Sequence, residues 1–157
     1  MHDLVVIGAG PGGYEAAAHA ARMGKSVALF EKQFLGGTCL NVGCIPTKTL
    51  LRSARAFTDC REASLYGVEA DEPGLDWDAV QTRKDKVVST LRKGVATMLK
   101  KAGVEVVTAE ARLAGRGCVT ANGTDYEAEH VLLATGSSPA CPPIPGLSKS
   151  EFVVDST

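Results

Sequence analysis

Residues 4–13 read LVVIGAGPGG, and this stretch decides the fold class. A short, continuous apolar run of this kind is typical of a strand buried on both faces in a parallel sheet. Gly8, Gly10 and Gly13 follow it in the spacing G-x-G-x-x-G, and an alanine-rich segment that should be helical continues to Met23. A strand, a glycine-rich turn and a helix in this order predict an α/β fold whose first unit binds a dinucleotide.

Each glycine of this turn has its own expected task. Gly8 permits the tight turn, Gly10 lets the backbone approach a pyrophosphate, and Gly13 lets the helix pack closely on the strand. The amide groups at the helix N-terminus favour the charge of the phosphates. A second apolar strand, residues 26–30, ends at Glu31, whose carboxylate can accept hydrogen bonds from ribose hydroxyls and would repel a 2′-phosphate. This pattern alone does not distinguish FAD from NAD.

A pair of cysteines follows in the next segment, where residues 36–48 read GGTCLNVGCIPTK. Pro46 stands where the first turn of a helix tolerates proline, so we expect a loop carrying Cys39 to lead into a helix that begins near Cys44. That geometry can bring the two Cα atoms within disulfide range. The helix N-terminus and Lys48, one turn further on the same face, should stabilise a thiolate on Cys44. Because the flanking glycines let the backbone approach a flat ring system, this thiolate could pass electrons to an oxidised isoalloxazine.

Other interpretations of the cysteine pair stay open at this point. Two free buried thiols is the simplest of them. A zinc half-site needs further ligands, and the sequence has no second C-x-x-C and no histidine cluster. A static disulfide is disfavoured in a reducing cytosol, and an odd number of irregularly spaced cysteines does not fit a secreted disulfide framework. The remaining cysteines are expected to be small core or surface residues: Cys60, Cys118 and Cys141.

Two helices are expected in the middle of the chain. The first runs from about Ile45 to Cys60, and a longer amphipathic helix runs from Trp77 to Ala102, with an irregular segment at residues 65–76 between them. Apolar residues near helical spacing, with Lys and Arg on the other side, indicate that one face of the longer helix packs in the core. That face is predicted to comprise Val80, Val87, Leu91, Val95, Met98 and Leu99.

The last part of the chain predicts a return to strands. A strand at residues 104–107 is followed by short antiparallel strands within residues 110–129, because glycine-containing turns occur at residues 115–117 and 122–123. A last buried strand is expected at residues 131–134. Together the elements predict an α/β, Rossmann-like domain with a parallel sheet, helical crossovers and a small antiparallel β insertion.

The composition fits one modest domain and excludes several function classes. The chain has 157 residues, a net charge of −1 and 5% aromatic residues, without a dense cluster of Lys and Arg. We therefore expect no binding to nucleic acid or to an anionic membrane surface. No apolar run approaches a membrane span and the N-terminus does not resemble a signal peptide, so a cytoplasmic location is expected.

Three features together resemble the pyridine nucleotide–disulfide oxidoreductases. They are the glycine-rich turn at residues 8–13, called the cradle below, the C-x4-C motif of Cys39 and Cys44, and the segment Ala-Thr-Gly-Ser at residues 134–137. The wording of residues 37–48 is most similar to the dihydrolipoamide dehydrogenase branch of that family. The resemblance spans the whole chain and implies bound FAD. It also implies that Cys39 is the thiol that exchanges with dihydrolipoamide, that Cys44 is the charge-transfer thiol beside the flavin, and that Lys48 lies near flavin N5. Glu31 would bind the adenosine ribose.

The same resemblance implies a set of FAD-contacting positions along the chain. Ala111 stands where family members contact adenine through backbone, although many have glycine there. Residues 135–137 match the second flavin-contact motif of the family. The predicted cofactor site comprises Gly8, Gly10, Gly13, Glu31, Lys32, Gly37, Thr38, Cys39, Gly43, Cys44, Lys48, Ala111, Thr135, Gly136 and Ser137, and no metal ligand.

The sequence also departs from the family pattern in what it lacks. It has no second G-x-G-x-x-G for an NAD domain, no later Gly-Asp segment to complete the FAD domain, and no His-Glu pair of an interface domain. The proline-rich residues 142–146 resemble a linker, so we expect residues 1–146 to be the incomplete N-terminal part of the FAD-binding domain and residues 147–157 to begin a linker to an NAD-binding domain. For the full-length protein we expect NAD as the final electron acceptor, dihydrolipoamide on a lipoyl carrier domain as the partner that is oxidised, and a homodimer.

Three alternatives to this function remain open. The chain could be a truncated, non-catalytic FAD-binding module, which predicts no reducible disulfide. It could also belong to a related reductase of the glutathione or mercuric type, which shares the motif frame. An NAD-only Rossmann dehydrogenase would explain residues 8–31 but would leave the cysteine motif without a role.

Overall fold

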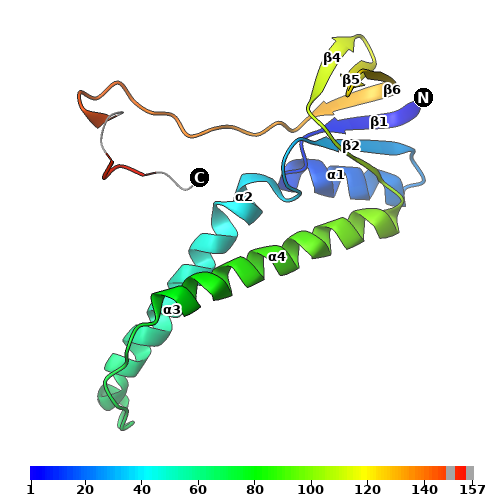
Figure 1. Cartoon of the computed structure of the whole chain (residues 1–157). Helices are drawn as coiled ribbons and strands as arrows, with labels where there is room; N and C mark the ends of the chain where they lie inside the picture. Colours follow the sequence, from blue (N-terminus) through cyan, green and yellow to red (C-terminus); the bar gives the residue numbers. More distant parts are fainter. Residues whose placement is uncertain (148–150, 155–157) are drawn as a thin grey trace.

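Residues 1–147 and 151–154 are described by a computed structural model of the chain, which is organised around a six-stranded sheet in the order β3-β2-β1-β6-β5-β4 (Figure 1). The strands are β1 (His2–Ile7), β2 (Val27–Glu31), β3 (Glu105–Thr108), β4 (Ala111–Gly115), β5 (Cys118–Ala121) and β6 (Thr124–Leu133). The helices are α1 (Pro11–Arg22), α2 (Gly37–Asn41), α3 (Cys44–Arg61), α4 (Trp77–Ala102) and the short 3-10 helix η1 (Ala63–Tyr66). The predicted α/β class with a parallel sheet and an antiparallel part is confirmed.

The parallel part of the sheet is built on β1. This strand pairs with β2 on one side, where Leu4 lies opposite Val27, and with β6 on the other, where Val5 lies opposite Val131. The strand β3 extends the sheet beyond β2, also in parallel. Since α1 connects β1 to β2, the first three elements form the βαβ unit that the glycine pattern predicted.

One strand serves both parts of the sheet, which corrects the expected boundaries. The sequence predicted an antiparallel insertion ending near residue 129 and a separate strand at residues 131–134, but β6 is one continuous strand of 10 residues. Residues 124–127 pair antiparallel with β5, and residues 128–133 pair parallel with β1. The alternation of apolar and polar residues changes where β6 leaves the antiparallel part and enters the buried parallel part of the sheet. This change in pattern led to the prediction of two strands in place of one.

The two faces of the parallel sheet are covered by different layers. Val6 is fully buried in the core that the sheet shares with α1 and α4, where Leu99 is also fully buried. Val5 faces the other side and is buried with Phe30 and Val119 beneath the antiparallel strands. The interpretation of β1 as a strand buried on both faces is therefore confirmed.

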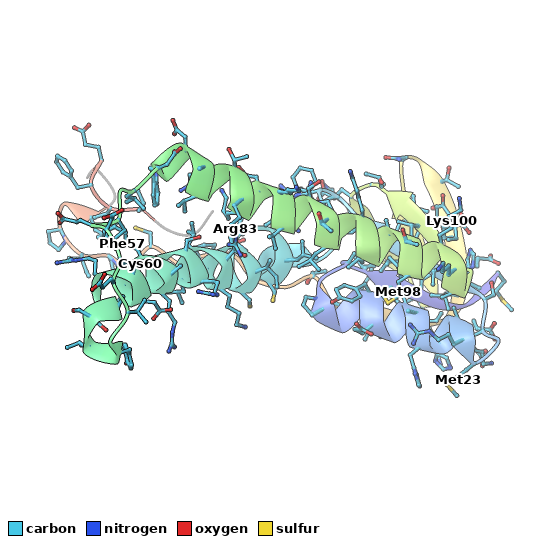
Figure 2. All side chains as sticks on the ribbon, turned by 90° about the horizontal axis from the view of Figure 1, so that it is seen from below. Met23, Phe57, Cys60, Arg83, Met98 and Lys100 are labelled. Atoms are coloured by element: carbon cyan, nitrogen blue, oxygen red, sulfur yellow. The ribbon has the colours of Figure 1, made fainter. Side chains whose placement is uncertain are left out.

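The long helix α4 packs against two different partners, and this changes its buried face. Figure 2 shows α4 lying beside α3 at one end and beside α1 at the other. Its buried residues are Val88, Val95 and Leu99, whereas Leu91, predicted to face the core, is 41% exposed. Helical spacing identified an apolar stripe but could not locate the change of partner along it. Within residues 1–147 and 151–154, no helix is long and apolar enough to cross a membrane.

Candidate functional site

The glycine-rich turn between β1 and α1 is shaped by close backbone packing. Gly8 has a φ of +101°, which favours glycine, and a Cβ there would overlap the carbonyl oxygen of Ala134. A Cβ on Gly13 would overlap the carbonyl oxygen of Gly8 and would lie 3.3 Å from the Ala134 Cβ. The expected tasks of Gly8 and Gly13, a tight turn and close helix packing, are thus confirmed, and both glycines pack against the end of β6.

The N-terminus of α1 is open to an anion. Gly10 is its N-cap, and none of the side chains that the structure describes caps this end by a hydrogen bond. The first turn holds no acidic residue and begins with Pro11, which has no amide hydrogen to satisfy. Amide groups at such a helix end carry partial positive charge, so this turn can hold a phosphate.

The carboxylate of Glu31 is fixed beside the turn. One of its oxygens accepts a hydrogen bond from the Ala9 amide at 2.9 Å, and the other accepts one from the Gln33 amide at 2.9 Å. Each carboxylate oxygen can accept a further bond, so the ribose hydroxyls of a nucleotide would still find acceptors. The Ala109 amide donates to the Glu31 carbonyl at 3.0 Å, and this bond brings the start of β4, with Ala111, toward the same end of β2.

The cysteine segment lies directly against the glycine-rich turn. The Gly36 amide donates to the Ala9 carbonyl at 2.8 Å. Gly37 has a φ of +57°, and a Cβ there would lie 2.7 Å from the Cα of Gly10. Two backbone segments without side chains therefore meet at this point, which fits the close approach of an extended dinucleotide.

Cys39 lies in a short helix rather than in the predicted loop. After Gly36, with a φ of +97°, the backbone forms α2, in which the Leu40 amide donates to the Gly36 carbonyl at 3.3 Å. Leu40 is 6% exposed and anchors this helix in the core. The glycine content suggested a loop, but glycines at a helix start and a buried leucine are compatible with one and a half turns of helix.

The helix α3 begins at Cys44, as predicted. The Thr47 amide donates to the Gly43 carbonyl at 3.1 Å, which closes the first helical turn, and Pro46 stands within that turn. Both cysteines are free thiols; Cys39 is half-buried and Cys44 is exposed.

The two thiols are neighbours, and their contact alters the acidity of one of them. A hydrogen bond with the Cys44 side chain raises the pKa of the Cys39 thiol above its ordinary value, and burial adds to this effect. The charge of Lys48 acts on the same thiol in the opposite direction. Burial also raises the pKa of Tyr14, with smaller contributions from the charges of Glu15 and Cys39, which places this tyrosine near the pair. The side chains of the two cysteines are therefore close enough to affect one another.

An arginine of α4 holds the segment that carries Cys39, and sequence reasoning did not identify it. Arg92 donates to the side-chain oxygen of Asn41 through Nε at 3.0 Å and Nη2 at 2.6 Å. Its guanidinium lies over the Phe34 ring, 4.2 Å from the centroid. Asn41 belongs to the quoted motif, but no local signal connects it to a residue so far along the chain.

The remaining predicted site residues are distributed around this centre. Thr135, which would lie 3.1 Å from a Cβ on Gly8, belongs to the exposed segment that leaves β6. Gly43 packs closely on the carbonyl of Thr38, so both remain beside the thiols. Lys32, Thr38, Lys48, Gly136 and Ser137 are exposed. Cys60 lies at the opposite end of α3 from Cys44, where Figure 2 shows it beside Phe57.

Comparisons with known proteins agree on one group. Residues 2–157 match the sequence profile of a family described as pyridine nucleotide-disulphide oxidoreductase. A protein of Acholeplasma laidlawii named dihydrolipoyl dehydrogenase is 45% identical over 150 residues, which are 95% of this chain and 45% of that protein. A Chlorobaculum parvum protein of the same name is 48% identical over 92% of this chain and 32% of that protein. The chain thus spans less than half the length of these relatives.

A solved structure shows the same arrangement. The HOCl-induced flavoprotein disulfide reductase RclA from Escherichia coli superposes with a TM-score of 0.81 at 31% sequence identity. The superposition covers 99% of this chain and 33% of the RclA chain.

Proposed function

Because this chain belongs to the pyridine nucleotide-disulphide oxidoreductase family, we propose that it forms the FAD-binding portion of a dihydrolipoamide dehydrogenase. The observation that carries the proposal is the pair of neighbouring thiols on α2 and α3, placed against a glycine-rich dinucleotide cradle. Relatives that bear the name dihydrolipoyl dehydrogenase support the choice of substrate.

The cradle offers a group for each part of FAD. The open N-terminus of α1 would receive the pyrophosphate, and Glu31 would accept hydrogen bonds from the adenosine ribose. The backbone near Ala111 would face the adenine. Residues 135–137 and Lys48 would line the flavin end, together with the exposed start of α3. Gly10 and Gly37 let the two backbone segments of the cradle meet because neither presents a side chain.

The cysteines would carry the exchange chemistry. Starting from the oxidised pair, a thiolate of dihydrolipoamide attacks the Cys39 sulfur and displaces Cys44 as a thiolate. The second substrate thiol then closes the lipoamide disulfide and releases the Cys39 thiol. The substrate would lose two electrons and two protons; the cysteine pair would gain both electrons, Cys39 would take one proton, and the other proton would go to solvent while Cys44 stays a thiolate. When bound, FAD would supply a two-electron acceptor between the thiols and NAD, and the overall reaction would convert dihydrolipoamide and NAD⁺ to lipoamide, NADH and a proton.

The proposed function requires the exposed side chain of Cys44 to lie against the cofactor. Cys44 is the more exposed thiol of the pair, yet the electron-delivering thiol must lie against the flavin. Bound FAD must therefore cover Cys44 while leaving Cys39 open to a dithiol. The full-length protein would receive that dithiol on a lipoyl carrier domain, and we propose that it is a cytoplasmic homodimer whose NAD-binding domain follows residue 146.

Cysteine alkylation tests the proposal directly. Iodoacetamide modification of the reduced chain, mapped by mass spectrometry with and without FAD, should slow several-fold at Cys44 when FAD is present. The exposed Cys60 provides the internal control, and its rate should not change. Equal rates at Cys44 in both conditions would contradict the proposed flavin position.

A second experiment addresses the substrate. Adding dihydrolipoamide to the oxidised chain should release thiols at Cys39 and Cys44, and Cys39→Ser or Cys44→Ser should abolish this release. Reduced glutathione at the same thiol concentration should act less well, because closing the lipoamide ring is intramolecular. A chain without a reducible disulfide would instead be a non-catalytic FAD-binding module, and equal reduction by both thiols would favour a reductase of the glutathione type.

A further inference from the structure

The helix α4 is hydrogen-bonded to both of the helices that carry the cysteine pair. Arg92 binds Asn41, the last residue of α2, and Arg83 donates to the Thr49 carbonyl of α3 at 3.1 Å. Figure 2 shows Arg83 between α3 and α4. The segments that carry Cys39 and Cys44 are thus each tied to the same rigid helix, far from both in sequence.

The orientation of the Asn41 side-chain amide is determined by its hydrogen-bond partners. The side-chain nitrogen of Asn41 donates to the carbonyls of Leu35 at 3.1 Å and Gly37 at 2.9 Å. Arginine has only donors, so the amide oxygen must face Arg92 and the nitrogen must face the two carbonyls. Every polar atom of the Asn41 side chain is therefore engaged in holding the turn at residues 35–41.

The guanidinium of Arg92 contacts the segment at residues 34–41. Among the residues that the structure describes, no ion pair involves Arg92, although its side chain is half-buried. Its guanidinium instead binds a neutral amide and covers the Phe34 ring. A partly buried cation that binds one turn through three hydrogen-bonding and ring contacts restrains that turn more tightly than a neutral side chain could.

The helix α2 depends on contacts with the rest of the chain, of which the buried Leu40 is one and the Arg92 contact another. The helix α2 has 5 residues, and an isolated helix of this length is not stable in water. Two glycines with positive φ precede or begin it. A disulfide between Cys39 and Cys44 tolerates only a narrow range of Cα separations, so the freedom of α2 limits how readily the bond forms.

We propose that Arg92, acting through Asn41, is a positioning residue that holds Cys39 in range of Cys44 and so sets the reduction potential of the pair. This inference rests on the proposed disulfide function of these two cysteines. Loosening the turn lowers the effective concentration of one thiol at the other, which favours the dithiol and makes the potential less negative.

The test is a redox titration of the 157-residue chain without FAD. The chain is equilibrated in glutathione buffers, its thiols are trapped by alkylation, and the oxidised fraction of Cys39 and Cys44 is measured by mass spectrometry. Arg92→Gln should lower the equilibrium constant for disulfide formation about tenfold, the loss expected for a charge-assisted hydrogen bond. For a two-electron couple this is a shift of about 30 mV.

Two further variants separate positioning from general stability. Arg92→Lys keeps the charge and one donor, so it should recover part of the shift and provides a measurement if Arg92→Gln does not fold. Arg83→Gln removes the hydrogen bond from α4 to the Thr49 carbonyl of α3. Because α3 has 18 residues and does not depend on this one bond, the equilibrium constant for disulfide formation should change by no more than about twofold. Asn41→Asp keeps the acceptor for Arg92 but loses both bonds to the turn, so it should shift the constant as Arg92→Gln does.

The outcomes distinguish this inference from the proposed function. If the wild-type chain forms no Cys39–Cys44 disulfide in any buffer, the proposed function fails together with the inference. If the wild-type disulfide forms and Arg92→Gln leaves its constant unchanged, only the positioning role of Arg92 is overturned. An equal shift in Arg83→Gln would also overturn it, because the effect would then reflect general loosening of α4.

Discussion

Adding one methyl group at Gly13 should be far more harmful than adding it at its neighbour Gly12. A Cβ on Gly13 would overlap the Gly8 carbonyl oxygen and would lie 3.0 Å from the Gly8 carbonyl carbon, both of which are backbone atoms. A Cβ on Gly12 meets nothing within 4 Å. Both residues lie in the first turn of α1, so the gain in helix propensity is similar for the two.

The magnitudes follow from these two environments. Replacing glycine by alanine in a helix contributes up to about 1 kcal/mol, which is the whole effect expected for Gly12→Ala. For Gly13→Ala the helix must move away from β1, and overpacking of a rigid site costs about 3 kcal/mol at the upper end of the usual range. Subtracting the same propensity gain leaves a net loss of about 2 kcal/mol, so the two variants should differ by about 3 kcal/mol.

The assay is urea unfolding followed by far-ultraviolet circular dichroism, with FAD binding measured in parallel. Gly13→Ala should unfold at lower urea than the wild type, with an unchanged slope, and should bind FAD more weakly because the cradle has moved. Gly12→Ala should unfold at the wild-type midpoint or above it. Equal midpoints for the two variants would refute the argument that close helix–strand packing explains the third glycine of the motif.

Two further predictions concern the site itself. Glu31→Gln should lower the free energy of unfolding by about 1–2 kcal/mol in urea titrations, because the new amide nitrogen faces a backbone donor that loses its acceptor. The same variant should weaken FAD binding in fluorescence titrations, and unchanged affinity would exclude Glu31 from the ribose contact. Lys48→Met should move the pH midpoint for alkylation of Cys39 further upward, because the pKa of this thiol is already raised and Lys48 opposes that rise. Only the thiolate reacts, so Cys39 should react more slowly at pH 8 in the variant, and a faster reaction would contradict the assigned sign.

Much of the fold could be predicted because its signals are local. The apolar run of β1, the glycine spacing and the alanine-rich helix occur within a few residues of one another, and each has a direct physical reason. The turn at Asn122 and Gly123 was equally local, and both residues adopt the positive φ that such a hairpin turn requires. The prediction of the site rests on equally local signals, because Cys39, Cys44 and Lys48 lie within ten consecutive residues of the sequence.

The parts that could not be predicted depend on contacts between distant segments. Nothing in the sequence around Leu91 shows that α4 changes partner from α3 to α1, so the residue that faces solvent there looked like a core residue. The glycines of the cysteine segment suggested a loop, and α2 forms because Leu40 is buried and Asn41 is held by Arg92. The same contact, across 51 positions, fixes the element that bears Cys39. Local motifs thus indicate the two thiols proposed to react, whereas the proposed positioning of Cys39 depends on a contact with a distant helix that carries no motif.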